Sequence, residues 1–191
     1  MALPVEIIPY QERWPAEFKA LAWPLRHALG RLALRIDHIG STAVVGLAAK
    51  DVIDIQITVS ALDEQVVSAM ASLGYTRPEA AYRDHAVPGF HGLDREWEKF
   101  FFRPPSGQRR THTHMRVQGR ANQRYALLFR DYLRAHPPTA QAYAELKRRL
   151  AQHLDNPEMY PEVKDPAVDL IYFAAEDWAA STRWQPGPSD A

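Results

Sequence analysis

The chain has 191 residues, no cysteine, and 23 basic against 23 acidic residues, so its formal net charge is zero. The lack of cysteine excludes disulfide scaffolds, thiolate metal sites and cysteine nucleophiles. Zero net charge disfavours nucleic-acid binding, which usually needs an excess of basic residues. The uncharged stretches are too short to span a bilayer, and the N-terminus lacks a signal-peptide pattern. We therefore expect a soluble cytoplasmic protein without membrane contacts.

Strand and helix patterns are mixed in the first 120 residues. Val5–Ile8 is an edge strand or a lead-in, and a helix follows with Pro15 in its first turn and Gly30 at its end. The patterns that follow in chain order are strands over Leu32–Asp37 and Val52–Val59, a helix over Leu62–Leu73, and strands over Trp97–Arg103 and Arg110–Val117. The turn-rich residues between the last two strands predict a hairpin.

The second part of the chain has helical spacing throughout. Helices are predicted over Asn122–Ala135, Thr139–Leu154 and much of Glu158–Thr182. We therefore expect an α+β protein with a mixed α/β part over residues 1–120, a helical part over 121–183 packed on it, and a loose tail over 184–191.

The segment after the second predicted strand carries the most informative motif. Gly40 lets the backbone turn sharply and approach a ligand closely, and Ser41 and Thr42 add hydroxyl groups beside it. Backbone N–H groups at the start of a following helix would suit a phosphate. A capped helix between two strands, with a glycine in the turn, would give the same pattern.

A carboxylate follows on the next apolar strand. Asp54 lies between Ile53 and Ile55, and an ionised group is costly to bury there unless it is paired or bound to a metal. Asp54 could hold Mg²⁺ against a phosphate, and Lys50 could add a point charge for the same anion. The alternative is a carboxylate that caps a loop at the end of the strand.

These residues carry a resemblance to a known family. The run from His38 to Lys50, followed by Ile53-Asp54-Ile55, resembles the signature of the GrpB family, which has a nucleotidyltransferase-like fold and also occurs attached to dephospho-CoA kinases. Further matches in the same order are Thr111–Val117, Leu128–Pro137, Tyr143–Lys147 and the Tyr160/Lys164 pair. The resemblance covers nearly the whole chain.

The resemblance implies a Gly-Ser turn ahead of a strand with carboxylates at positions i and i+2, which share a face and can share metal ions. Gly40-Ser41 matches the turn and Asp54 the first carboxylate, but the second position is Gln56. A neutral amide cannot neutralise two divalent cations, and this counts against a two-metal mechanism. Glu96 or Glu98 would be the third carboxylate.

Every second residue of the last predicted strand is an arginine or a histidine, and these residues share one face. They are Arg110, His112, His114 and Arg116. Such a row suits an anion such as phosphate. The two histidines could also bind a metal together with Asp54, and a solvated basic edge strand is the alternative.

The helical part gives fewer candidates. Arg130 either forms a surface ion pair with Asp131 or reaches the cleft. Tyr160 and Lys164 are four residues apart and so share a helix face. Both could contact a base or a phosphate, although a stacked surface pair would have the same spacing.

Two classes of function fit these residues. In a metal-dependent nucleotidyltransferase, Asp54 would hold Mg²⁺, and the Gly-Ser turn with Lys50 would hold a triphosphate. His112 or His114 would steady the substrate or act as a base. Alternatively, the chain is a non-catalytic module that binds a nucleotide or other phosphate-bearing small molecule and assists a partner enzyme, with a connection to coenzyme A biosynthesis. Gln56 favours this second class, because its amide removes a metal site but not a phosphate site.

Overall fold

The computed structural model describes residues 4–191. In this part of the chain a four-stranded sheet with the order β1-β2-β4-β3 is combined with five α-helices. The strands are β1 (Arg35–Ile39), β2 (Ile53–Val59), β3 (Phe100–Phe102) and β4 (Thr111–Val117). The helices are α1 (Trp14–Leu29), α2 (Glu64–Ser72), α3 (Ala121–Ala135), α4 (Pro137–His153) and α5 (Tyr160–Thr182).

The sheet is mixed, and its register brings polar residues together. β2 is antiparallel to β1 and parallel to β4, and β3 is antiparallel to β4. Asp54 lies opposite His112, and Gln56 lies opposite His114. Because side chains alternate along a strand, these residues share one face of the sheet.

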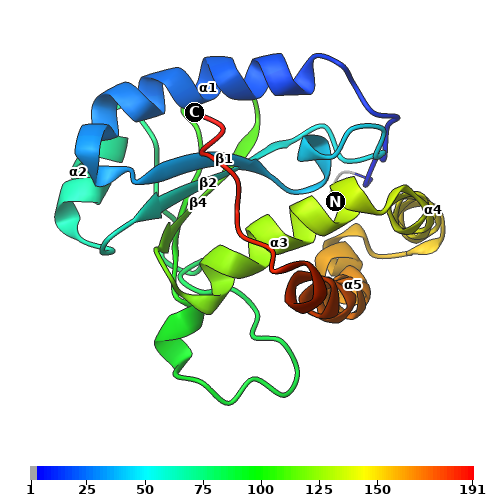
Figure 1. The fold of residues 1–191 in the computed structure, drawn as a ribbon. Helices are drawn as coiled ribbons and strands as arrows, with labels where there is room; N and C mark the ends of the chain where they lie inside the picture. The colour runs from blue at the N-terminus through cyan, green and yellow to red at the C-terminus, as the bar shows by residue number, and fades with distance from the viewer. Residues whose placement is uncertain (1–3) are drawn as a thin grey trace.

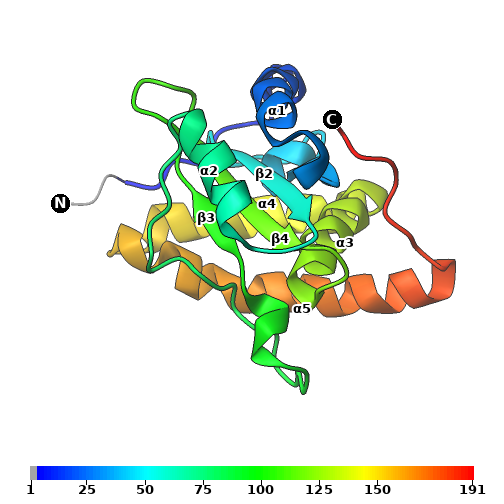
Figure 2. The same cartoon turned by 90° about the vertical axis from the view of Figure 1, so that its left-hand side faces the viewer.

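The sheet is the middle of three layers. α1 and α2 cover one face, and α3, α4 and α5 lie on the other side (Figure 1). The view in Figure 2 places α1 above the sheet and α5 below it. The isoleucines that alternate with Asp54 and Gln56 are fully buried in the core on the α1 side, with Phe18 of α1 and Met70 of α2. The polar face of β2 is therefore turned toward the C-terminal helices.

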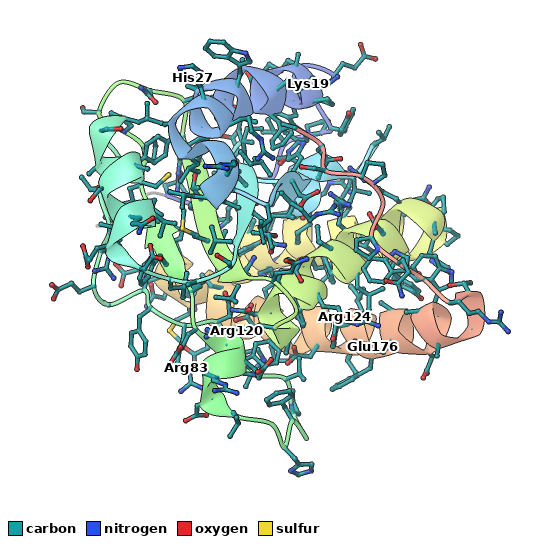
Figure 3. The ribbon with its side chains drawn as sticks, turned by 60° about the vertical axis from the view of Figure 1, so that its left-hand side comes forward. Lys19, His27, Arg83, Arg120, Arg124 and Glu176 are labelled. Carbon is teal, nitrogen blue, oxygen red and sulfur yellow. The ribbon has the colours of Figure 1, made fainter. Side chains whose placement is uncertain are left out.

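A second hydrophobic core lies among the three C-terminal helices. It contains Leu133 of α3 and Ala175 of α5, and also Leu47 from the connection between β1 and β2. The helical part therefore shares its core with the first part of the chain. Arg124 and Glu176 add an ion pair of 2.8 Å between α3 and α5, and Figure 3 places them next to each other.

The α+β class and the helical C-terminal part are confirmed. The strand predicted over Trp97–Arg103 is shorter, at Phe100–Phe102, because Trp97 belongs to a 3₁₀ helix. It pairs antiparallel with β4, so the predicted hairpin is present. Val5–Ile8 contributes a single bridge from Ile8 to the β1–β2 connection. Within residues 4–191 no helix has both the length and the apolar character needed to cross a membrane.

The prediction of a loose tail over residues 184–191 is wrong. This segment runs along the outer edge of β1 (Figure 1). The hydroxyl of Ser189 accepts the N–H of Ile36 at 2.9 Å, and the carboxylate of Asp190 accepts the N–H of His38 at 2.9 Å. An edge strand presents unpaired backbone groups, and polar side chains can bond to them without any apolar pattern in their own sequence.

Candidate functional site

A pocket of about 480 Å³ lies between the polar face of the sheet and the C-terminal helices. Residues from the β1–β2 connection, β2, β4, α3, α4 and α5 line it. The lining includes most of the residues predicted from the sequence, namely Gly40, Ser41, Thr42, Lys50, Asp54, His112, His114, Tyr160 and Lys164. The fold thus brings together predicted residues that are up to 124 positions apart, from Gly40 to Lys164.

Gly40 forms the turn at the wall of this pocket. Its φ is +69°, and a Cβ built on it would lie 2.9 Å from Cγ of Asp54. The turn therefore needs glycine both for its backbone conformation and for the close approach of the carboxylate. Ser41–Ala43 form one 3₁₀ turn, so the α-helix N-terminus expected after Gly40 is absent. The backbone N–H groups of an α-helix start, which the prediction assigned to a phosphate, are therefore not present after this turn.

Asp54 and His112 form a pair across neighbouring strands. Oδ1 of Asp54 and Nδ1 of His112 are 3.1 Å apart, and both side chains are partly exposed to the pocket. The contact follows from the register, which sets the two residues directly opposite each other. A histidine oriented by a carboxylate can exchange a proton with a substrate hydroxyl, so this pair is the candidate acid–base group.

Lysines concentrate in this pocket. Of the five lysines in the chain, four line it, namely Lys50, Lys99, Lys147 and Lys164. Lys99 is paired with Asp84, and Lys164 with Asp165. The other two have no carboxylate within 4.0 Å among the described residues. The pocket therefore carries positive charge that the surrounding side chains do not fully neutralise.

Lys147 is the most buried of these lysines, with 3% of its surface exposed. Its Nζ donates to Oγ of Ser41 at 2.8 Å and to the carbonyl of Ala48. Burial, followed by the positive charge of Lys164, lowers the pKa of Lys147 to about 7. Its ammonium group thus fixes the Gly-Ser turn and is poised to gain or lose a proton near neutral pH.

Lys50 and Tyr160 contact each other in the wall of the pocket. The Nζ of Lys50 lies 3.9 Å from the centre of the Tyr160 ring, a cation–π contact. Burial, and next the charge of Lys164, lower the pKa of Lys50. The hydroxyl of Tyr160 is buried and has no hydrogen-bond partner among the described residues. A buried hydroxyl without a partner is destabilising, and a ligand in the pocket could supply that partner.

Gln56, the position of the second carboxylate in the family pattern, does not line the pocket. It is fully buried, its Oε1 accepts from Nη1 of Arg116 at 2.6 Å, and its Nε2 donates to the carbonyl of Gln123 at 3.1 Å. Arg116 also bonds to both oxygens of Asp84. Burial opposes the charge of Asp84, but Arg116 and then Lys99 outweigh it and hold the pKa of this carboxyl well below its usual range. These residues form a structural network.

His114 lines the pocket as a neutral ring. Burial, followed by the charges of Lys99 and Arg116, lowers its pKa well below the ordinary histidine value. Nη2 of Arg116 lies 3.5 Å from its Nδ1. His114, which the sequence places in a row of residues suited to an anion, therefore offers a ring nitrogen to a ligand and no positive charge at neutral pH.

The residues present do not fit a two-metal centre. In residues 4–191 no group of three or more histidine, aspartate or glutamate side chains is placed to hold a metal ion. The Asp54–His112 pair is a cluster of two. Gln56, at the second carboxylate position, and the nearby Asp84 are both bonded to Arg116.

The remaining predicted residues lie outside the pocket. Arg110 is exposed and does not line it. Arg130 is buried, and its guanidinium donates to the carbonyl of His38 and to Asp131 and Asp190. It therefore joins α3 to β1 and the tail and does not reach the cleft. Of the candidate third carboxylates, Glu96 accepts the N–H of Ala121 and Glu98 pairs with Arg120, so neither faces the site.

Sequence reasoning missed Lys147, Lys99 and Asp84. Lys147 had a detectable signal, because it falls on the same face of α4 as the buried Ala140 and Tyr143, at the spacing i, i+3, i+7. A lysine on the apolar stripe of a helix needs a polar partner inside the protein. Asp84 lies in an irregular segment whose position depends on distant contacts.

The fold and site define an α+β protein with a lysine-rich pocket between a mixed sheet and a helical bundle. The GrpB protein family profile matches residues 4–173, and the chain belongs to this family. It is similar to the crystal structure of conserved protein GrpB from Enterococcus faecalis, with a TM-score of 0.70 and 30% identity over 91% of this chain and 99% of that one.

Two relatives are similar over nearly the whole chain. A dephospho-CoA kinase of Mycolicibacterium paratuberculosis is 38% identical over 96% of this chain and 49% of its own length. The UPF0157 protein YqkA of Bacillus subtilis is 36% identical over 98% of this chain and 50% of its own length. The chain thus spans about half the length of these relatives.

Proposed function

We propose that the lysine-rich pocket binds a nucleotide or another phosphate-bearing small molecule, with the phosphates against Lys50, Lys147 and Lys164. The observation that carries the proposal is the crowding of these cations. Lys164 lowers the pKa of both neighbours, after burial, so each positive charge destabilises the others. An oxyanion between them would relieve this repulsion and form charge-assisted hydrogen bonds.

The volume and lining of the pocket support a ligand of nucleotide size. Ligand sites commonly have volumes of about 300–1,000 Å³ with apolar walls and a few polar groups, and this pocket has about 480 Å³. Phe129, Tyr143 and Val168 form apolar wall opposite the sheet. The unpartnered hydroxyl of Tyr160 adds a donor for a ligand oxygen.

Gln56 favours a protein that binds its ligand without catalysing a reaction. Its side chain is held by Arg116 and Gln123, so the carboxylate that a two-metal transferase needs is replaced by a structural amide. Nucleotidyl transfer through the Asp54–His112 pair remains the second candidate, because a histidine oriented by a carboxylate can deprotonate an acceptor hydroxyl. The name of the Mycolicibacterium relative adds coenzyme A and dephospho-coenzyme A to the ligands worth testing.

The test is a calorimetric titration and thermal-shift panel with nucleoside triphosphates, coenzyme A and dephospho-coenzyme A, each with Mg²⁺ and with a chelator. A ligand at about 100 times its Kd should stabilise the fold by roughly 2.7 kcal/mol. We expect binding to persist in chelator, because lysines supply the positive charge. Lys164→Gln should weaken binding about tenfold, the loss of one charge-assisted hydrogen bond.

Arg149→Gln is the matched control, since Arg149 lies on α4 with a side chain that is 72% exposed. It should leave the affinity unchanged. A panel in which no ligand stabilises the protein would contradict the proposal, and so would a Lys164→Gln variant that binds as tightly as this control. Asp54→Asn separates the two candidates: unchanged affinity supports a binding module, whereas loss of metal-dependent binding supports a transferase.

A further inference from the structure

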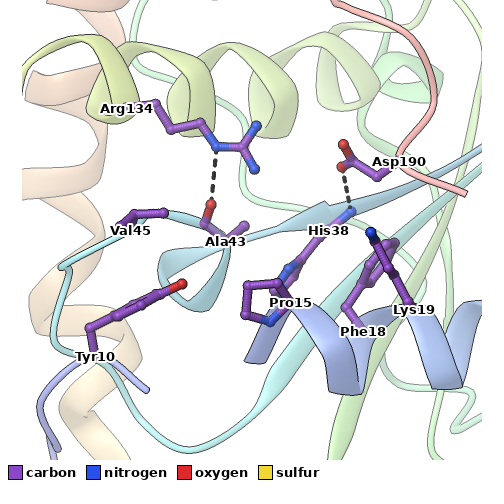
Figure 4. Close-up of a pocket in the computed structure, with 9 residues that line it drawn as sticks. All are labelled: Tyr10, Pro15, Phe18, Lys19, His38, Ala43, Val45, Arg134 and Asp190. Carbon is purple, nitrogen blue, oxygen red and sulfur yellow. Dashed lines mark hydrogen bonds between the residues drawn. The ribbon is translucent and has the colours of Figure 1, made fainter. Parts of the chain in front are cut away.

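A second pocket, of about 570 Å³, lies on the other side of the segment from Gly40 to Val45 (Figure 4). It lies between α1, the end of β1, the last turn of α3 and the tail. The two pockets have no lining residue in common. What binds in one therefore need not bind in the other.

This second pocket holds the remaining lysine of the chain. Lys19 of α1 lines it, and among the described residues no carboxylate lies within 4.0 Å of its ammonium group. Arg134 of α3 lines the opposite side, where its Nε donates to the carbonyl of Ala43 at 3.0 Å. In Figure 4 both cationic groups point into the same opening. Nη1 of Arg134 lies 3.5 Å from the carboxylate of Asp131, and among the described residues its Nη2 has no hydrogen-bond acceptor.

A carboxylate of the protein already lies in this pocket. Asp190 accepts from the backbone N–H of His38 at 2.9 Å and from Nη1 of Arg130 at 2.7 Å. Arg130 does not line the pocket, and it neutralises Asp190 from behind. The ammonium group of Lys19 and Nη2 of Arg134 are therefore the groups left for a second anion beside Asp190.

Phe18 and His38 line the floor of the pocket, with 2% and 4% of their surfaces exposed. The rings of Phe18 and His38 stack with their centres 4.8 Å apart and their planes at 3°. Nε2 of His38 lies 3.0 Å from Oγ1 of Thr42, which itself donates to the carbonyl of Val52. His38 is therefore the donor in its contact with Thr42, and the ring is neutral because burial lowers its pKa to about 4. A neutral aromatic floor suits the apolar body of a ligand.

We propose that this second pocket binds a small organic oxyanion, with its carboxylate or phosphate group between Lys19 and Arg134 and its apolar body over the Phe18–His38 floor. The site is independent of the ligand of the lysine-rich pocket. Its specificity comes from Lys19 and Arg134, which share one opening, and from the stacked rings of Phe18 and His38 beneath them.

The test is a titration of the ¹⁵N-labelled full chain with benzoate, phenyl phosphate and inorganic phosphate, followed by amide chemical shifts. We expect benzoate or phenyl phosphate to shift the amides of Lys19, Ala43 and Val45, and phenyl phosphate to bind more tightly than inorganic phosphate. The more tightly bound of the two aromatic anions identifies the preferred oxyanion. Lys19→Gln should weaken binding about fivefold, the effect of losing one exposed ionic contact.

Two further variants make the result specific. Val45 is 79% exposed, so Val45→Glu adds a negative charge at the opening without disturbing the core, and it should weaken binding at least as much as Lys19→Gln. Lys164→Gln, in the other pocket, should leave it unchanged. The proposal is overturned if neither aromatic anion shifts these amides at millimolar concentration. It is also overturned if both opening variants bind like the wild type, or if inorganic phosphate binds as tightly as phenyl phosphate.

Discussion

The chemistry of Lys147 depends strongly on its surroundings. A lysine with 3% of its surface exposed is stable only when its nitrogen keeps hydrogen-bond partners, and Ser41 and Ala48 supply them. A neutral amine can make the same two donations, so the protein tolerates both protonation states. The state then depends on pH and on what lies in the pocket.

The affinity for a phosphate-bearing ligand should fall as pH rises through about 7, because Lys147 loses its proton there. Titrations from about pH 6 to pH 9 should show Kd rising with pH in the wild type, and Lys147→Met should remove that dependence. A wild-type Kd that is constant over this range would contradict the assignment.

The same pKa has a defined effect on stability. The folded pKa of about 7 lies below the ordinary lysine pKa of 10.5, so the unfolded chain binds more protons between these two values. The free energy of unfolding from this group should therefore rise with pH across that window. Urea titrations of wild type and Lys147→Met at several pH values would separate this contribution from the effect on ligand affinity.

At the scale of elements, the turn between β1 and β2 carries the site. Gly40 and Asp54 are the two residues for which sequence reasoning came closest to the structure. The reason is local, since a turn glycine and a carboxylate on the next strand belong to one short β-turn-β unit. The helical turn expected after Gly40 is a single 3₁₀ turn over Ser41–Ala43, because residues 44–48 turn away to join the core of the C-terminal helices.

The rest of the site depends on contacts between distant residues. The sequence revealed that Gln56 breaks the carboxylate pattern, but not that Arg116, 60 positions later, binds its side chain. His114 was identified on the correct strand face, yet its neutral state follows from Lys99 and Arg116. Charge states and partners of this kind depend on tertiary packing, which periodicity along one element does not contain.

Gly40→Ala tests whether the close approach of Asp54 to residue 40 requires glycine, and Gly46→Ala is its matched control. Both glycines have positive φ, +69° and +79°, but a Cβ at Gly46 meets nothing within 4 Å, whereas one at Gly40 meets Asp54. Gly46→Ala should lose about 1 kcal/mol of unfolding free energy from backbone strain alone. Gly40→Ala should lose about 1–3 kcal/mol more, measured by urea unfolding.

Gly40→Ala should also move the carboxylate of Asp54 and so shift the NMR signals of the His112 ring, which is 3.1 Å from it. Gly46→Ala should leave these signals in place. Equal losses of stability in the two variants, with an unchanged His112 ring, would mean that Gly40 serves the backbone conformation alone.

At the scale of the whole molecule, the tail and Arg130 connect the layers. Arg130 of α3 donates to β1 through the carbonyl of His38 and to the tail through Asp190. The tail in turn bonds to the edge of β1 through Ser189. The N-terminal sheet and the C-terminal helices are therefore linked in two ways. One link is the shared core around Leu47, and the other is this polar network at β1.

Asp190→Ala tests how much this network contributes. The substitution leaves the N–H of His38 without its acceptor and removes one of the partners of the buried Arg130. Breaking a buried ion pair costs about 3–5 kcal/mol, and because Arg130 keeps Asp131 and the carbonyl of His38 we expect a loss of about 2–3 kcal/mol. Asp155→Ala is the control, since Asp155 is exposed and pairs with no described cation within 4.0 Å. Urea unfolding should show a lower free energy of unfolding for Asp190→Ala alone. Equal unfolding midpoints for Asp190→Ala and Asp155→Ala would mean that the tail lies along β1 without stabilising the fold.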